Sequence, residues 1–230
     1  MIKGKQSIAF ETSPYIEASA SVVGKKEGEG PLGSMFDMVG QDDMFGENTW
    51  EEAESTMQKE ACLLALGKAH LTADAVRYLF GGDLLRQGVA TSMGVETLQI
   101  PMFGLYGACS TSWEALALAS MCVAAGYGER MLAVTSSHFG SAEKEFRFPL
   151  GYANQRPLSA HWTVTGSGAF IVGKSRSHVR ITGVTVGKIV DYGLKDSQNM
   201  GACMAPAACD TIIQNLEDFG RKEDDYDRII

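Results

Sequence analysis

Short apolar runs recur along this chain, and each is followed by glycine or polar residues. Such runs are typical of strands that lie inside a sheet. They predict strands at 16–23, 76–80, 100–106, 131–135 and 166–173. Stretches with helical spacing lie between them. We therefore expect an α/β fold in which helices cover both faces of a mixed, mainly parallel sheet.

Helix signals are clearest at Thr49, which has the side chain of a good N-cap residue. Glu52 follows three residues later, as a capping box requires. This predicts a helix that continues to about Ala69, and a second helix is expected at 84–95. The glycine-rich residues 24–33 predict a loop, and residues 34–48 predict an irregular excursion.

The most informative stretch follows the strand predicted at 100–106. Gly107 and Ala108 allow a tight strand-to-helix turn, and the hydroxyls of residues 110–112 can cap the helix that follows. Cys109 then lies at a helix N-terminus, where the helix dipole favours the thiolate. The alternative is a buried structural cysteine, since free cysteine is among the most buried residue types. The turn and its serines favour a residue that lines a pocket.

Composition limits the kinds of ligand and partner. The net charge of −8 argues against nonspecific nucleic-acid binding, and any anionic ligand must be held by local groups. The five cysteines are odd in number and lack CxxC spacing, so neither a disulfide framework nor a zinc site is indicated. A reducing compartment fits this cysteine usage best. These cysteines are Cys62, Cys109, Cys122, Cys203 and Cys209.

Neither a secretory signal nor a membrane span is visible in the sequence. The N-terminal segment, Met1 to Gln6, is polar overall and has no apolar segment behind it. No window reaches the roughly 20 apolar residues that a membrane helix needs. We therefore expect a soluble or peripheral protein.

A weak internal repeat affects the expected domain organisation. Residues 15–25 resemble residues 178–188, and two helices with similar apolar spacing follow, near 62–69 and 212–219. Each helix leads into a polar connection and then an apolar pair. These connections contain Asp74 or Asp224, and the pairs are Leu79-Phe80 and Ile229-Ile230.

Two matching segments in the same order favour duplication over chance similarity. The repeat predicts that residues 1–177 form one complete half and that residues 178–230 begin a second, incomplete half. On this interpretation the chain is truncated at its C-terminus.

A duplicated α/β unit with a cysteine at a strand–helix turn resembles the thiolase and ketoacyl synthase superfamily. From about residue 5 onward the chain is also similar to the stage V sporulation protein AD (SpoVAD) family. The strings that carry this second resemblance are Ile8-Ala9-Phe10, Gly81-Gly82-Asp83-Leu84-Leu85, Leu105-Tyr106-Gly107-Ala108-Cys109-Ser110-Thr111, Phe146-Arg147-Phe148-Pro149, Asn154-Gln155-Arg156-Pro157 and Thr165-Gly166-Ser167-Gly168-Ala169.

The resemblance implies a thiolase-like fold and a role in bacterial endospore formation. Proteins of this family bind dipicolinic acid, alone or as its calcium chelate, and help move it into the forespore with other SpoVA proteins. The expected location is therefore cytoplasmic or peripheral on the forespore inner membrane. No cofactor or metal site is expected, and calcium enters only as part of the ligand. The superfamily also implies a homodimer, expected to pair through the strand at 131–135.

A planar dianion needs N–H donors, hydroxyls and an arginine in fork geometry. The Cys109 turn can supply main-chain N–H groups at a helix N-terminus. A histidine near a strand end is a further candidate, because α/β sites gather there. The candidate ligand-binding residues are Cys109, Ser110, Thr111, Arg147, Arg156 and His161.

An acyltransferase of the thiolase type is the alternative function. By resemblance, Cys109 stands where the superfamily places its acyl-accepting nucleophile. Such an enzyme also needs His or Asn groups to activate the thiol and stabilise an oxyanion. The four histidines, at 70, 138, 161 and 178, match no catalytic histidine of the superfamily. A noncatalytic ligand binder is therefore favoured.

Overall fold

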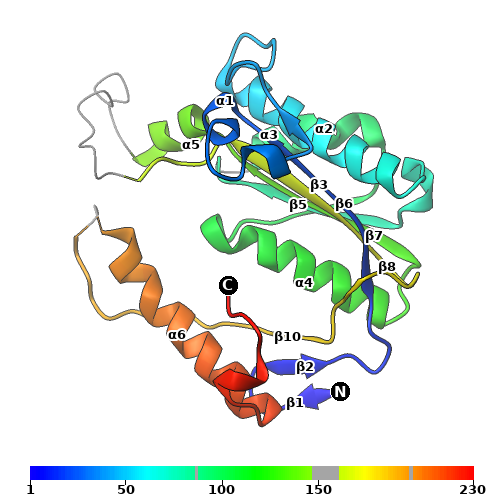
Figure 1. The fold of residues 1–230 in the computed structure, drawn as a ribbon, viewed down its shortest axis with the longest axis vertical. Coiled ribbons are helices and arrows are strands. Elements are labelled where there is room, and N and C mark those ends of the chain that lie inside the picture. The colour runs from blue at the N-terminus through cyan, green and yellow to red at the C-terminus, as the bar shows by residue number, and fades with distance from the viewer. Residues whose placement is uncertain (86–87, 147–160, 197–198) are drawn as a thin grey trace. The chain divides into compact units, whose positions relative to one another are not determined.

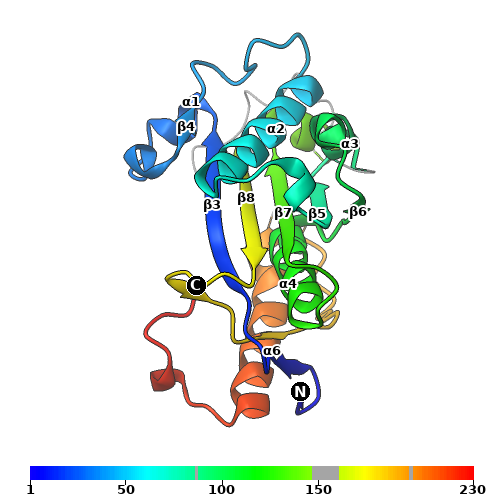
Figure 2. The same ribbon diagram turned by 90° about the vertical axis from the view of Figure 1, so that its right-hand side faces the viewer.

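The structure is a computed structural model that describes residues 1–85, 88–146, 161–196 and 199–230. It contains two compact units. The larger unit is Pro14–Arg180, and the smaller unit combines Met1–Ser13 with Ile181–Ile230. Figures 1 and 2 show the elements of each unit.

A seven-stranded sheet forms the centre of the larger unit, as far as the structure describes it. Its main path runs in the order β4-β3-β8-β7-β5-β6, and β9 pairs with β3. β8 is antiparallel to both β3 and β7, whereas β5 is parallel to β6 and β7. The strands are β3 (Tyr15–Val23), β4 (Met38–Val39), β5 (Tyr78–Asp83), β6 (Met102–Gly104), β7 (Arg130–Ser137), β8 (Gly166–Gly173) and β9 (Val179–Arg180).

Helices cover both faces of this sheet. α2 (Trp50–Lys68) and α3 (Val89–Val95) lie on one face, and α4 (Thr111–Ala124) lies on the other (Figure 1). Two shorter helices are α1 (Lys25–Gly28) and α5 (Phe139–Phe146). The predicted α/β class and the mixed sheet are confirmed.

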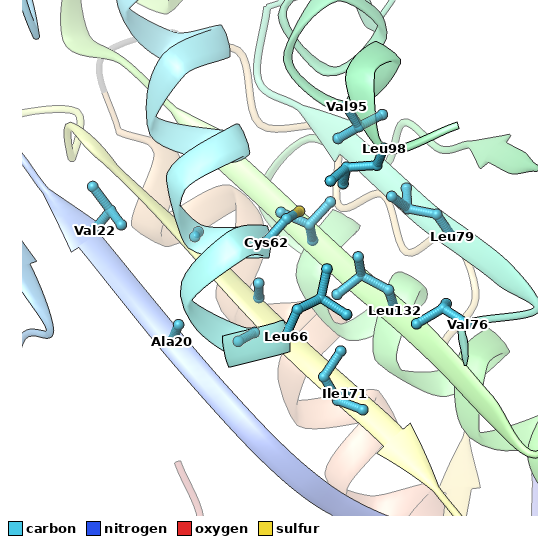
Figure 3. Packing of buried hydrophobic residues seen from close by; sticks show 14 of the residues in the cluster. Ala20, Val22, Cys62, Leu66, Val76, Leu79, Val95, Leu98, Leu132 and Ile171 are labelled. Atoms are coloured by element: carbon cyan, nitrogen blue, oxygen red, sulfur yellow. The ribbon is translucent and has the colours of Figure 1, made fainter. Parts of the chain in front are cut away.

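The main core lies between α2 and the sheet (Figure 3). Met57 and Cys62 of α2 are fully buried against Leu79, Leu132 and Ile171 of three strands. Burying a side chain of this size stabilises a fold by roughly 1.5–3 kcal/mol. Four of the five predicted apolar strands therefore support this core, whereas the run at 100–106 gives β6, which covers only Met102–Gly104 and is exposed at all three residues.

The predicted N-cap at Thr49 is confirmed, but the reciprocal half of the capping box is not, because the Glu52 carboxylate accepts the Thr49 hydroxyl rather than the Thr49 main-chain N–H. The Thr49 hydroxyl accepts the Glu52 N–H at 3.2 Å and donates to the Glu52 carboxylate at 3.0 Å. A main-chain donor that the helix cannot satisfy internally is thereby paired. α2 ends at Lys68, close to the predicted end at Ala69.

Three predicted segments differ from the structure. The expected loop at 24–33 contains α1, and the expected excursion contains β4, which pairs in parallel with β3. The helix predicted from Leu84 begins only at Val89. Gly88 precedes it with φ of +65°, a left-handed conformation that interrupts a right-handed helix.

The strand predicted to form a dimer interface lies inside the sheet. Met131 of β7 pairs with Tyr78 of β5 on one side and with Val172 of β8 on the other. Both edges of β7 are hydrogen-bonded over 131–136, so it cannot also pair with a second copy. The prediction that 131–135 mediates dimerisation is wrong. The strand at the edge of the sheet, beyond β5, is β6.

The smaller unit contains a three-stranded antiparallel sheet in the order β1-β2-β10, against which α6 (Met200–Phe219) packs. Asp218 of α6 accepts the main-chain N–H groups of Lys5 and Gln6, both at 2.9 Å. These contacts attach residues 1–13 to the C-terminal segment. The strands are β1 (Ile2–Lys3), β2 (Ser7–Ala9) and β10 (Gly183–Thr185).

α2 and α6 end in the same local structure. Each is followed by equivalent main-chain hydrogen bonds, 150 residues apart, and by a short 3₁₀ turn that contains Asp74 or Asp224. The matching bonds are Leu71 to Leu66 with Arg221 to Leu216, and Val76 to Ala73 with Tyr226 to Glu223. The chain passes from the larger unit to the smaller one after Arg180. The proposed division into related halves stays a prediction.

Candidate functional site

The candidate site lies at the end of the large sheet where its parallel strands terminate. β5, β6 and β7 are parallel and end there, and antiparallel β8 begins there. Cys109 follows β6, His138 follows β7 and His161 precedes β8. The ends of β6 and β8 are three strand spacings apart, or about 14 Å. Cys109 and His161 therefore lie at the same end of the sheet, but next to strands that are not neighbours.

Cys109 lies in a 3₁₀ turn, Ala108–Ser110, which leads directly into α4. Its side chain is exposed, so the alternative of a buried structural cysteine is wrong. Ala108 has φ of +50°, a conformation that costs free energy for a residue with a Cβ. The turn is therefore tight, as the small residues before Cys109 predicted.

Thr111 holds this turn together. Its hydroxyl accepts the Gly107 N–H at 2.9 Å and donates to the Ala108 carbonyl at 2.8 Å. Thr111 is buried, with 3% of its surface exposed. Two hydrogen bonds from one buried side chain oppose the strain at Ala108.

The serine capping that the sequence predicted is wrong. No side chain caps α4, because the Ser110 hydroxyl donates back to the Gly107 carbonyl at 2.8 Å. The main-chain N–H groups of Ser110 and Thr111 bond to Gly107 and Ala108. The N–H groups of Ala108 and Cys109 have no acceptor in the described part of the chain. These two groups, rather than those of residues 110 and 111, can bind an anion.

The other predicted ligand residues are less well placed by the structure. Arg147 and Arg156 lie outside the described residues. His161 is exposed and lies at the same end of the sheet as Cys109. Their proposed contacts with a ligand stay predictions.

A buried polar network lies behind the Cys109 turn, and the sequence did not predict it. Gln58 of α2 donates through Nε2 to the Gly82 carbonyl at 2.9 Å, and Nε2 lies 2.9 Å from Thr91 Oγ1 and 2.8 Å from Ser136 Oγ. The Ser136 hydroxyl donates to Glu54 Oε1 at 2.8 Å. Glu54 and Gln58 are one helical turn apart and fully buried. Two polar residues at this spacing on an apolar helix face were the available sequence signal.

Gly82 connects this network to the Cys109 turn. A Cβ on Gly82 would lie 2.4 Å from the Leu105 carbonyl oxygen and 2.5 Å from Thr111 Cγ2. The chain before Cys109 therefore packs directly on the Gly82 main chain. Only glycine permits this approach without moving one of the two segments.

Burial perturbs both carboxyl groups of the network. Burial raises the pKa of Glu54 to about 7, although hydrogen bonds from Ser141 and Ser136 act in the opposite direction and nearby Asp83 raises it further. Burial also raises the pKa of Asp83, and the two hydrogen bonds from Thr91 offset part of this effect. The interior therefore favours the neutral form of these acids.

His138 has a structural position rather than a catalytic one. Its Nδ1 accepts the Gly140 N–H at 3.0 Å, so Nε2 carries the proton and donates to the Asp43 carbonyl at 2.7 Å. Burial lowers the pKa of His138, with smaller opposing effects from Asp43 and Glu27. Both ring nitrogens are occupied, so His138 cannot act as a base toward Cys109.

A depression of about 480 Å³ lies at the opposite end of the sheet, where β5, β6 and β7 begin. It is lined by residues 73–77, 98–101 and 128–129 and does not reach Cys109. Among the described residues, no group of three His, Cys, Asp or Glu side chains is arranged to hold a metal ion. In the same part of the chain, no helix has both the length and the apolar character of a membrane span.

The cysteines offer a direct test of these positions. We expect an alkylating reagent to modify Cys109, Cys203 and Cys209, which are exposed, and to leave Cys62 unmodified in the folded protein. Burial raises the pKa of the Cys62 thiol to about 12, which removes the reactive thiolate. Peptide mass spectrometry after brief labelling measures each site, and unfolded protein is the control. Early labelling of Cys62 would contradict the packing of α2.

The sheet and its helix layers give this chain a thiolase-like fold. Xanthomonas campestris OleA with bound cerulenin matches 96% of this chain and 75% of its own, with a TM-score of 0.65 and 14% identity. The 3-oxoacyl-(acyl carrier protein) synthase III, FabH, of Xanthomonas oryzae matches 96% of this chain and 77% of its own, with a TM-score of 0.64 and 14% identity. These likenesses concern the fold.

The chain belongs to the stage V sporulation protein AD (SpoVAD) family. The sequence model of that family matches residues 4–230. Stage V sporulation protein AD of Bacillus subtilis (strain 168) is 43% identical over 229 residues, which is 100% of this chain and 68% of that relative. The resemblance seen in the sequence is confirmed.

Proposed function

We propose that this protein binds dipicolinic acid, free or as its calcium chelate, at the Cys109 turn. It supports uptake of this ligand into the forespore together with other SpoVA proteins, in the cytoplasm or at the surface of the inner membrane. The proposal needs no cofactor, and calcium enters only with the ligand. Membership of the SpoVAD family supports the ligand class, and the turn supports the place.

The exposed turn is the observation that carries this proposal. Two main-chain N–H groups, at Ala108 and Cys109, have no acceptor among the described residues and lie just before the 14-residue helix α4. Such donors and the positive helix end favour a carboxylate there. The protein has a net charge of −8, so local donors have to supply this attraction. Arg147, Arg156 and His161 stay proposed partners of the remaining ligand groups.

Isothermal titration of the full-length protein with dipicolinate, with and without calcium, tests this function. We expect binding that weakens about tenfold or more in Cys109→Trp, because the indole covers the two N–H donors. Cys203→Trp is the matched control, since Cys203 is also exposed and lies on α6. No heat under either condition, or equal affinity of both variants, would contradict the proposal.

Acyl transfer is the second candidate, because the exposed Cys109 stands on a strained turn at a helix start. In that reaction the Cys109 thiolate attacks the carbonyl carbon of an acyl thioester. A new Sγ–acyl bond forms, the original C–S bond breaks, and the leaving thiolate takes up a proton. Incubation of the full-length protein with an acyl thioester would then give a mass increase on the Cys109 peptide, and an unmodified peptide would exclude this function.

We also propose that the protein forms a homodimer through β6. This strand lies at the sheet edge with Met102 and Phe103 exposed, at 38% and 52%. An apolar edge strand with unpaired main-chain groups is a ready pairing surface. Light scattering should report a dimer that Phe103→Asp dissociates, while Tyr127→Asp, at another exposed aromatic position, leaves it intact. A monomer before mutation would contradict this proposal.

A further inference from the structure

Two carbonyl groups of the Cys109 turn are directed at the first residues of α4. The Gly107 carbonyl accepts the Ser110 N–H at 3.0 Å and the Ser110 hydroxyl at 2.8 Å. The Ala108 carbonyl accepts the Thr111 N–H, and it also accepts the Thr111 hydroxyl at 2.8 Å. Both lone pairs of each carbonyl oxygen are therefore in use.

Each of these carbonyls fixes the direction of an N–H group. The Gly107 carbonyl and the Ala108 N–H belong to one peptide unit, and the Ala108 carbonyl and the Cys109 N–H belong to the next. In a trans peptide unit the C=O and N–H bonds point in opposite directions. Carbonyls directed at α4 therefore direct the N–H groups of Ala108 and Cys109 away from it. These are the two N–H groups that have no acceptor in the described part of the chain.

The Thr111 hydroxyl holds the peptide units on both sides of Ala108. It donates to the Ala108 carbonyl and accepts the Gly107 N–H at 2.9 Å. Ala108 lies between these two contacts with φ of +50°, a conformation that costs free energy for a residue with a Cβ. Without the hydroxyl, Ala108 can relax to an ordinary φ, and this rotation would turn the two free N–H groups away from each other.

The Thr111 side chain is itself fixed by the sheet. A Cβ on Gly82 of β5 would lie 2.5 Å from Thr111 Cγ2, so the methyl group packs directly on the β5 main chain. Branching at Cβ restricts threonine to few rotamers, and only 3% of the Thr111 surface is exposed. The hydroxyl is therefore available to the turn rather than to a ligand in solvent.

We propose that Thr111 is a positioning residue for the ligand site. Its hydroxyl keeps Ala108 in the left-handed conformation and so aims the N–H groups of Ala108 and Cys109 at one carboxylate. The aiming of these two groups is a property of the free protein. Its consequence for ligand affinity rests on the proposed function.

Isothermal titration of full-length variants with dipicolinate tests this role. Thr111→Val keeps the branched shape without the hydroxyl and should bind about tenfold more weakly, because the two N–H groups no longer act on one carboxylate. Thr111→Ser restores the hydroxyl and should recover most of the affinity. Ser120→Ala is the matched control, because it removes a buried hydroxyl of the same helix that donates to the Leu116 carbonyl at 2.6 Å. Equal affinity of Thr111→Val and Ser120→Ala would overturn the proposal.

Amide hydrogen exchange, followed residue by residue by NMR, tests the same role without a ligand. The Gly107 N–H is bonded to the Thr111 hydroxyl, whereas those of Ala108 and Cys109 have no acceptor among the described residues. In the unaltered protein we expect the Gly107 amide to exchange at least about tenfold more slowly than the other two. Thr111→Val should remove this protection, and Thr111→Ser should keep it. Equal exchange of the three amides in the unaltered protein would overturn the proposal even if Thr111→Val does not fold.

The two measurements separate this inference from the proposed function. If dipicolinate does not bind the unaltered protein, the proposed function fails, and the exchange pattern still decides the role of Thr111. If dipicolinate binds but the Gly107 amide is unprotected, the proposed function stands and the role of Thr111 fails.

Discussion

A Gly82→Ala variant will lose about 1–3 kcal/mol of unfolding free energy and the described form of the Cys109 turn. The added methyl group would lie 2.4 Å from the Leu105 carbonyl oxygen and 2.5 Å from a Thr111 methyl group. Main chain cannot yield as a flexible side chain can, so the segment before Cys109 has to move. Chemical denaturation measures the loss, and the alkylation rate at Cys109 reports the moved turn.

Gly104→Ala is the matched control for this change. Gly104 is the last residue of β6, close in sequence to the same turn, and a Cβ there meets nothing within 4 Å. We expect this control to keep the stability and the Cys109 reactivity of the unaltered protein. Equal behaviour of the two variants would show that Gly82 does not support the turn.

Glu54 will give the folded protein a pH-dependent stability that Glu54→Gln removes. Burial raises the pKa of Glu54 from 4.5 to about 7. Between these values the folded protein keeps a proton that the unfolded chain releases, so stability falls as the pH rises. The fall is about 3 kcal/mol in total and is complete above about pH 7.

Denaturant unfolding across this pH range measures the effect. The difference in stability between Glu54→Gln and the unaltered protein should grow in favour of the variant as the pH rises from 4.5 to 7. Glu96→Gln is the control, because Glu96 is exposed and its side chain makes no described contact. Parallel stability curves for all three proteins would contradict the buried position of Glu54.

Features set by neighbouring residues could be predicted from the sequence. The N-cap of Thr49 on the Glu52 N–H involves two residues of one helical turn, and the structure contains it. The tight turn before Cys109 follows from the small residues at 107 and 108, and Ala108 has a left-handed conformation there. Apolar runs likewise identified the buried strands that carry the core.

Features set by pairing across the fold could not be predicted in this way. Gln58 and Ser136 are 78 residues apart in sequence, so nothing local indicates that they meet. The superfamily resemblance suggested residues 131–135 for a dimer interface, but the apolar run there does not reveal that its strand is paired on both sides inside the sheet. Ser110 has the residue type of a cap, but its hydroxyl bonds to Gly107 instead. Such choices depend on the three-dimensional neighbours of each group.

Protection of Cys109 by dipicolinate tests the central claim most directly. Alkylation rates at Cys109 and Cys203 are measured in the full-length protein, with and without saturating dipicolinate and calcium. A ligand on the N–H groups of Ala108 and Cys109 should slow modification of Cys109 several-fold and leave Cys203 unchanged. If dipicolinate binds while both rates stay the same, the ligand site is not the Cys109 turn.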